Sequence, residues 1–244
     1  MVESGMKDQC IIVNLAKGID LDSLSTMSQV IQGGTSIGID QIVSLYGPSH
    51  AEEVVRKLPT TLVAACPKKT TSKKIQELMS SEVLRVYRNK DILGVEIGGS
   101  LKNVMAIAAG ICDGIGYGDN SKAAILTRGI TEMTRLGVKM GAKKSTFSGL
   151  SGIGDLLVTA LSQHSRNRYV GECIGQGKSL QEVTDGMDMI AEGINTCQAV
   201  PRIVEKYDIE MPIAMAVNGI LFKNKDPLAA VKELMTRNLA AEKR

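Results

Sequence analysis

The first candidate for a chemically reactive residue in this sequence is a lysine, Lys102. It lies near the start of an apolar stretch, 98–120, that is rich in Gly and Ala. On a helical period of 3.6 residues it shares one face with Ala106, Ala109 and Asp113, and the apolar residues fall on another. Small neighbours would leave the ammonium group partly desolvated, which favours proton transfer. The alternative, which the pattern alone favours, is a solvated lysine whose stem lies on the surface.

Three further places carry reactive or charged groups. Lys17 ends an apolar run, 10–18, that we expect to be a buried parallel strand, and ligands bind at the carboxyl ends of such strands. Asp155 starts a short helix, where it could cap the helix or pair with a lysine. The segment 165–168, Ser-Arg-Asn-Arg, suits phosphate oxygens, although it could equally be a solvated basic turn.

The first hundred residues must position these groups, and they alternate between strand and helix. A turn at Gly47-Pro48 precedes a helix that we expect Ser49 to cap, and we interpret His50 as structural. The pattern predicts a doubly wound α/β sheet with antiparallel strands at one side. The expected strands are 10–18, 42–46, 60–66, 83–89 and 92–98, the last two forming a hairpin, and the expected helices are 20–30 and 68–80.

From residue 98 onward the sequence is helical, so we expect an α/β domain at 1–98 and an all-α domain at 99–244. The first two helices should span 100–115 and a segment from Asn120 or Ser121, as its cap, to about 141. A Gly-rich loop is expected at 146–154. Further helices are expected from 155, near 168–176, 179–185, 192–207 and 211–222, and after an Asp226 cap with Pro227 at the first position.

The composition sets limits on function. Hydrophobic residues make up 43% of the 244 residues, and the net charge of +3 argues weakly for an anionic small substrate and against nucleic acid. Five scattered cysteines form no CxxC pair, and two histidines offer no metal cluster, so we expect reduced thiols and a cytoplasmic protein. No uninterrupted apolar run reaches about 18 residues, so no membrane span is expected.

Long segments of the chain resemble the NAD(P)-dependent glycerol-3-phosphate dehydrogenases, most closely the bacterial-type branch. The segments are GGSLKNVMAIAAGICDGIGYGDNSKAAILTRGITEM, STFSGLSGIGDLLVTALSQHSRNR and AEGINT, and AKGID and GPSHAEEVVRKLPTTLVAA fit upstream in the right order. The resemblance covers nearly the whole chain. Other two-domain dehydrogenases, such as those for 6-phosphogluconate or hydroxyacids, are disfavoured because the GDN-K, GD and SRNR segments are typical of the glycerol-phosphate branch.

The resemblance implies hydride transfer between a nicotinamide (NAD or NADP) and dihydroxyacetone phosphate or sn-glycerol 3-phosphate. It implies that Lys102 is the general acid/base, that Lys17 touches substrate and cofactor, and that Asp155 orients the site. Thr159, one helical turn further, is a lesser candidate. Substrate contacts are implied for Lys17, Gly47, Ser49, Lys102, Asn103, Asp155, Ser165, Arg166 and Asn167, and cofactor contacts for Lys17, Ala51, Arg166, Ile190 and Glu192.

The sequence departs from the family at its start. Family members begin with a strand and a glycine fingerprint, neither of which is found here. We therefore expect a partial Rossmann-type sheet that lacks the first half of the dinucleotide-binding domain, and no means of distinguishing NAD from NADP. The alternative to an enzyme is an inactive truncated remnant, acting only as a dimerising or polyol-phosphate-binding module. The apolar helical face after Ile130 would suit a homodimer.

Overall fold

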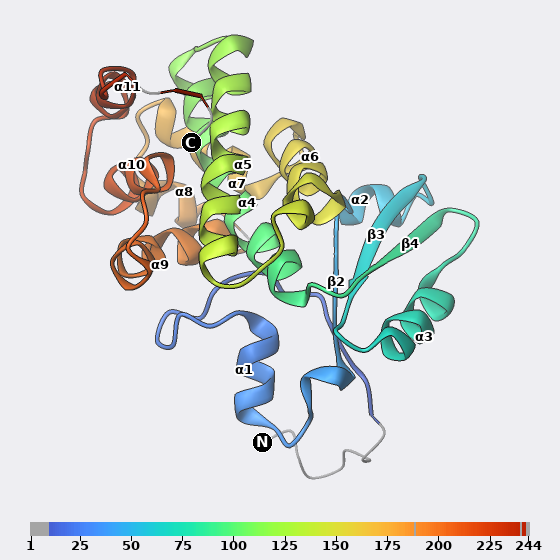
Figure 1. Ribbon diagram of the computed structural model, residues 1–244. Coiled ribbons are helices and arrows are strands. Elements are labelled where there is room, and N and C mark those ends of the chain that lie inside the picture. The colour runs from blue at the N-terminus through green and yellow to red at the C-terminus, as the bar shows by residue number, and fades with distance from the viewer. Residues whose placement is uncertain (1–9, 188, 240, 243–244) are drawn as a thin grey trace.

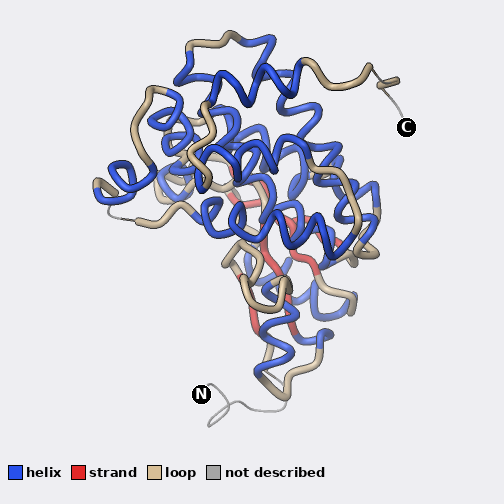
Figure 2. Tube along the Cα trace, turned by 90° about the vertical axis from the view of Figure 1, so that its left-hand side faces the viewer, coloured by secondary structure: helices blue, strands red, loops and turns tan. Residues whose placement is uncertain are grey.

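The molecule consists of a small sheet layer and a larger group of helices. The computed structural model describes residues 10–187, 189–239 and 241–242, so the polar stretch 1–9 lies outside the described residues. Strands with flanking helices lie at one end, and the helices of the second half of the chain lie at the other (Figure 1). The side view shows the strands beneath the helical part and the chain narrowing toward its N-terminal end (Figure 2). The predicted α/β part followed by an all-α part is confirmed.

The sheet has four strands in the order β1-β2-β3-β4. The β1/β2 and β3/β4 pairs are parallel, whereas β2 and β3 are antiparallel, so the sheet is mixed. The strands are β1 (Ile12–Asn14), β2 (Ile42–Tyr46), β3 (Thr60–Ala65) and β4 (Leu84–Asn89). All four lie where strands were predicted, because each is a short apolar run bounded by turn residues.

Helices cover both faces of this sheet. Helix α3 (Lys69–Met79) packs Ile75 against Leu62 and Val86 on one face. On the other face, Tyr46 and Val63 pack with the first turn of α4 and with Ile31 of α1 (Met27–Gly34). A third, larger apolar cluster lies within the helical part. The carboxyl ends of β1 and β2 therefore lead directly to the boundary between the sheet and the helices.

Helix α4 (Ile92–Ile115) is the central element, and it corrects the predicted hairpin. Residues 92–98 are the first turns of this 24-residue helix and not a strand. The Asp91 side chain starts it by accepting a hydrogen bond from the Gly94 N–H at 3.0 Å. Because α4 is buried on nearly all sides, its sequence carries no polar stripe that would reveal a helical period. The predicted domain border at 98/99 falls inside α4, so that division stays a prediction.

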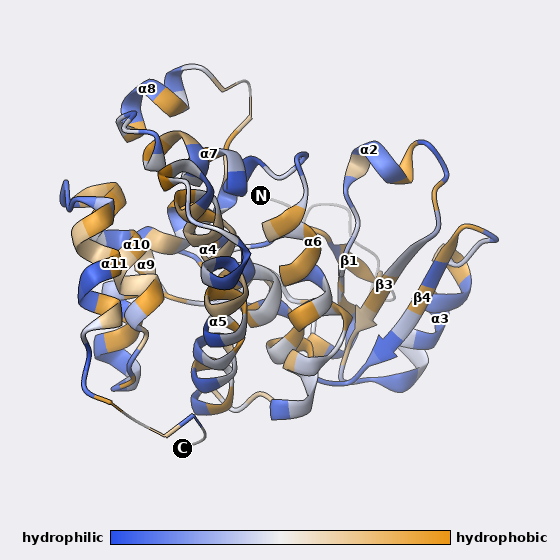
Figure 3. Ribbon diagram, turned by 90° about the horizontal axis from the view of Figure 1, so that it is seen from above, coloured by the Kyte–Doolittle hydropathy of each residue, from blue (hydrophilic) through white to orange (hydrophobic). Residues whose placement is uncertain are grey.

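The remaining helices surround α4. They are α2 (Ala51–Val54), α5 (Asp119–Lys139), α6 (Asp155–Leu161), α7 (Arg166–Gly175), α8 (Leu180–Asp185), α9 (Glu192–Tyr207), α10 (Pro212–Phe222) and α11 (Pro227–Met235), with 3-10 turns at Ile39–Gln41 and Lys144–Ser148 and a π-turn at Leu150–Gly154. Hydrophilic and hydrophobic bands alternate along α5 and α11, as expected for helices with one solvent face (Figure 3). The Asp226 cap is confirmed, since its carboxylate accepts from the Ala229 N–H at 2.7 Å.

Three local predictions are wrong. The predicted helix 20–30 is instead a turn followed by α1, because Asp20 binds the N–H and hydroxyl of Ser23 and closes that turn. The predicted loop 146–154 is largely helical, wound into the 3-10 and π-turns. Helix α5 starts after Gly118 and not after Asn120 or Ser121, with Asp119 in its first turn.

Helices α4 and α7 cross at backbone contact. A Cβ placed on Gly171 would lie 2.0 Å from the Ile107 carbonyl oxygen, and one on Gly110 would lie 2.0 Å from the Arg168 carbonyl oxygen. Gly114 and Gly175 repeat the arrangement one turn further along. The glycines of the apolar stretch thus let a second helix approach closely. Helix α4 is long and apolar enough to cross a membrane, but 94% of that apolar window is buried inside the molecule.

We predict that Gly171→Ala destabilises the fold by about 2–3 kcal/mol, because the new methyl group meets backbone that cannot rotate away. The matched control is Gly33→Ala in α1, where no atom lies within 4 Å of the added Cβ, and which should be neutral or slightly stabilising. Chemical denaturation of both variants measures the difference. Equal unfolding free energies would contradict the backbone-contact interpretation.

Candidate functional site

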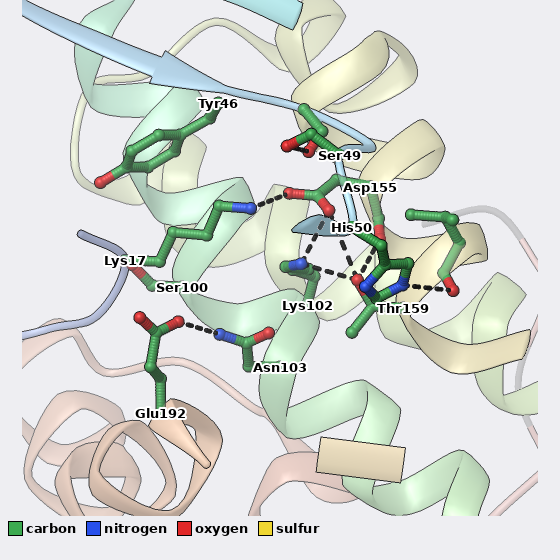
Figure 4. A network of polar contacts seen from close by, with 12 residues as sticks. Lys17, Tyr46, Ser49, His50, Ser100, Lys102, Asn103, Asp155, Thr159 and Glu192 are labelled. Carbon is green, nitrogen blue, oxygen red and sulfur yellow. Dashed lines mark hydrogen bonds and ion pairs between the residues drawn. The ribbon is translucent and has the colours of Figure 1, made fainter. Parts of the chain in front are cut away.

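Two lysines meet on one carboxylate at the boundary between the sheet and the helices (Figure 4). The Asp155 carboxylate binds Lys17 Nζ through Oδ2 at 2.8 Å and Lys102 Nζ through Oδ1 at 2.7 Å. Lys102 also donates to the Thr159 hydroxyl at 2.6 Å. The Lys102 and Asp155 side chains are only 7% and 2% exposed, against 16% for Lys17. Lys102 is therefore a buried, paired lysine and not the solvated one that its pattern favoured.

The charges of this cluster shift the pKa values of its members. Burial, together with the neighbouring charge of Lys17, lowers the pKa of Lys102 to about 8, against the opposing attraction of Asp155. Burial alone would raise the pKa of Asp155, but its two lysine partners hold that pKa below the usual value. A lysine with a pKa of about 8 can donate a proton as the ammonium and accept one as the neutral amine near neutral pH. The cluster therefore has the protonation chemistry of an acid/base site.

Three segments position the cluster. Lys17 follows β1, and the next residue, Gly18, has a φ of +146° and donates its N–H to the Ser100 hydroxyl at 3.1 Å. Lys102 lies on α4, one turn after Gly98. A Cβ placed on Gly98 would be 2.6 Å from the Ser151 carbonyl oxygen. This close approach places the π-turn, and Asp155 directly after it, against α4. Asp155 is not the cap of α6, since Gly154 occupies that position.

A second set of contacts joins α4, α7 and α9. Asn103 donates to the Glu192 carboxylate at 3.1 Å, and the buried Asn167 accepts from the Gly193 N–H at 2.9 Å. The exposed Arg166 donates to the Ile190 carbonyl at 3.1 Å. Five of the predicted site residues are thereby brought together where the starts of α7 and α9 meet the middle of α4.

The segment 165–168 is a helix start and not a solvated turn. Ser165 caps α7 by accepting from the Arg168 N–H at 3.2 Å, and Arg168 binds Asp113 on α4 through Nε at 2.7 Å. Asp113 also binds Lys122 of α5. Of the four residues, Arg166 is the one whose charge faces solvent without a carboxylate partner among the described residues.

The turn after β2 carries the predicted Gly47, Ser49 and Ala51. Gly47 has a φ of +146°, and a Cβ there would meet the Thr61 carbonyl oxygen at 3.0 Å, so the tight turn requires glycine. The predicted Ser49 cap is wrong: His50 holds the N-cap position of α2, and the Ser49 hydroxyl donates back to the Gly47 carbonyl at 3.2 Å. Ala51 is exposed at the first position of α2. His50 contacts the Val158 carbonyl of α6 at 3.5 Å.

Sequence reasoning missed two side chains around the cluster. Ser100 holds Gly18, and Tyr46 lies beneath Lys17, with the Lys17 nitrogen 5.6 Å from its ring centroid. Tyr46 reads in the sequence as the last residue of an apolar strand. A polar ring at the carboxyl end of a buried strand is the signal that could have found it. No cluster of metal-binding side chains is found in the described part of the chain.

Comparisons with known proteins agree on one family. The family models described as the C-terminus and the N-terminus of NAD-dependent glycerol-3-phosphate dehydrogenase match residues 91–232 and 1–72. A glycerol-3-phosphate dehydrogenase [NAD(P)+] of Salinibacter ruber is 56% identical over 95% of this chain and 67% of its own length. One from Chlorobium phaeobacteroides is 56% identical over 93% of this chain and 68% of its own.

A solved structure also resembles this fold. The crystal structure of glycerol-3-phosphate dehydrogenase from Coxiella burnetii superposes with a TM-score of 0.85 and 37% identity. The superposition covers 93% of this chain and 69% of that one. The mixed sheet and the helical part therefore follow the arrangement of that protein.

We predict that Asp155→Asn lowers the free energy of unfolding by about 3 kcal/mol at pH 6, because two ammonium groups lose their shared counter-charge in a buried site. Without Asp155 the pKa of Lys102 falls further, so the folded state favours the neutral amine. Between that lower pKa and the wild-type value of about 8, the folded variant has lost the Lys102 proton while folded wild type still holds it, so the deficit should shrink as the pH rises toward 8 and stay constant above it. Denaturation at pH 6 and pH 9 measures it.

The control for this variant is Glu233→Gln, which breaks the exposed pair with Lys225 and should cost less than about 1 kcal/mol at either pH. A loss in Asp155→Asn that is the same at both pH values would contradict the titration of Lys102.

Proposed function

Because the chain belongs to the NAD-dependent glycerol-3-phosphate dehydrogenase family, we propose that Lys102 is the general acid/base with which it interconverts dihydroxyacetone phosphate and sn-glycerol 3-phosphate. The chain is an NAD(P)-dependent oxidoreductase of this class. The observation that carries the proposal is the burial of Lys102 against Asp155, with 2.7 Å between the Lys102 nitrogen and the carboxylate. The names of the matched relatives favour an enzyme over the non-enzymatic alternative.

Lys102 handles the proton of the reaction. In the direction of reduction, the carbonyl oxygen of dihydroxyacetone phosphate gains the electron pair of its C=O bond and takes a proton from Lys102 Nζ, which becomes a neutral amine. In the reverse direction the neutral amine removes the hydroxyl proton of glycerol 3-phosphate. A pKa near 8 keeps both forms accessible close to neutral pH. Thr159 and Asp155 direct the Lys102 ammonium through hydrogen bonds of 2.6 and 2.7 Å.

Lys17 provides the second positive charge of the site. Its ammonium lies on the other oxygen of the same carboxylate and is more exposed than Lys102. A cation there stabilises the negative charge that develops on the substrate oxygen. The substrate phosphate is then left to the groups in the middle of α4 and at the start of α7. We assign these to Asn103, Arg166 and Asn167, with Gly47 and Ser49 on the opposite turn.

The residues present fit part of a nicotinamide coenzyme, NAD or NADP. When bound, its nicotinamide ring supplies or accepts the hydride at C2 of the substrate. Arg166 uses one N–H on the Ile190 carbonyl and is exposed, so its other donors remain open to a phosphate group. We propose that Lys17, Ala51, Arg166, Ile190 and Glu192 hold the coenzyme.

We also propose a cytoplasmic location, where thiols stay reduced. The five cysteines are free, and four of them are buried. Assembly into a homodimer stays a prediction from the apolar face after Ile130.

The test is oxidation of NADH and NADPH by the purified chain with dihydroxyacetone phosphate. We predict turnover, and a loss of roughly 10²–10⁴-fold in Lys102→Ala, the size expected for removing a general acid. Lys73→Ala is the matched control, since Lys73 is 59% exposed and its partner Glu77 is on the same helix. An active Lys102→Ala chain would contradict the role of Lys102, and a folded wild-type chain without turnover would contradict the proposed function.

A further inference from the structure

Tyr46 is the last residue of β2, and its side chain is held from every side. It is 1% exposed, within the apolar cluster between the sheet and the start of α4. A Cβ placed on Gly99 would lie 2.6 Å from Tyr46 Cδ2, so α4 packs directly on the ring. A ring confined in this way occupies one position. The ring and the hydroxyl of Tyr46 can therefore hold the groups that contact them in fixed positions.

The hydroxyl of Tyr46 makes two hydrogen bonds, both to the segment that leads to Lys17. It donates to the Ala16 carbonyl and accepts from Asn14 Nδ2 at 3.0 Å. Asn14 in turn accepts from the Ala16 N–H at 3.1 Å and donates to the Ala16 carbonyl at 3.2 Å. The two backbone polar groups of the residue before Lys17 are thus fixed by side chains of β1 and β2. A phenylalanine would fill the same apolar volume without these bonds.

The ring faces the Lys17 ammonium itself. The 5.6 Å from Lys17 Nζ to the ring centroid lies within the range of a cation–π contact. The same nitrogen lies 2.8 Å from Asp155 Oδ2. On the far side of Lys17, the Gly18 N–H is held by Ser100 of α4. The ammonium is therefore bounded by the ring and the carboxylate, and the backbone is fixed both before and after it (Figure 4).

We propose that Tyr46 is a positioning residue for Lys17: its hydroxyl fixes the backbone before Lys17, and its ring holds the Lys17 ammonium against Asp155. This inference rests on the proposed function for its effect on catalysis, because it makes Tyr46 act on substrate only through Lys17. The confinement of the Lys17 amine by Tyr46 can be measured without any turnover.

The experiment compares Tyr46→Phe, which keeps the ring and removes the hydroxyl, with Tyr46→Leu, which removes both. Tyr87→Leu is the matched control, because Tyr87 is a half-exposed tyrosine on β4 that stacks with Arg85, a residue outside the site. The full chain is treated briefly with acetic anhydride, and the acetylation of each lysine is followed by mass spectrometry. Lys73, on the surface of α3, reports the reactivity of an unconfined lysine in every sample.

Lys17 should be acetylated about two- to threefold faster in Tyr46→Phe and roughly tenfold faster in Tyr46→Leu, with Lys73 unchanged throughout and Tyr87→Leu like wild type. In the turnover assay kcat should fall in the same order. If Tyr46→Leu does not fold, Tyr46→Phe carries the test. Unchanged Lys17 acetylation in a folded Tyr46→Phe or Tyr46→Leu chain would overturn the proposal. A wild-type chain without turnover would overturn the proposed function alone, because the acetylation pattern does not depend on it.

Discussion

The carboxylate of Asp155 is the interaction on which the rest of the site depends. Lys17 comes from the end of a strand, and Lys102 comes from the central helix, so nothing in local sequence brings them together. The two ammonium groups, one buried and one partly exposed, repel each other, and a shared carboxylate offsets that repulsion. The same arrangement leaves Lys102 with a pKa of about 8, because burial and the repulsion from Lys17 outweigh the attraction of one carboxylate.

The packing of other segments around α4 brings the groups of this contact together. Helix α4 runs from the sheet into the helical part, and glycines at its crossing points let other segments reach its backbone. At Gly98 the approaching segment is the π-turn that carries Asp155, and at Gly110 it is α7, whose first turn carries Arg166 and Asn167. Lys102 lies on α4 between these two approaches, and its side chain is 7% exposed. Packing along one helix thus sets both the geometry and the acidity of the site.

Much of this could be predicted from the sequence, and the failures have physical causes. The four strands and the run of helices follow from short apolar runs and capping residues. The start of α4 was missed because a helix buried on all sides has no polar stripe, and ILGVEIG then resembles a strand. Lys102 and Asp155 were recognised as chemical groups, but their pairing, 53 residues apart, is a property of packing. The role of Tyr46 is not visible in the sequence, because its partners, the Ala16 carbonyl and the Asn14 side chain, lie about 30 residues away.

Catalysis by this site requires that Lys102 is a buried ammonium whose pKa is lowered into the range of proton transfer. The most direct measurement is an NMR titration of the wild-type chain labelled at lysine Cε, with the Lys102 signal assigned by its loss in Lys102→Arg. We predict a midpoint near pH 8 for Lys102. A Lys102 midpoint at or above the ordinary lysine value of about 10.4 would contradict it.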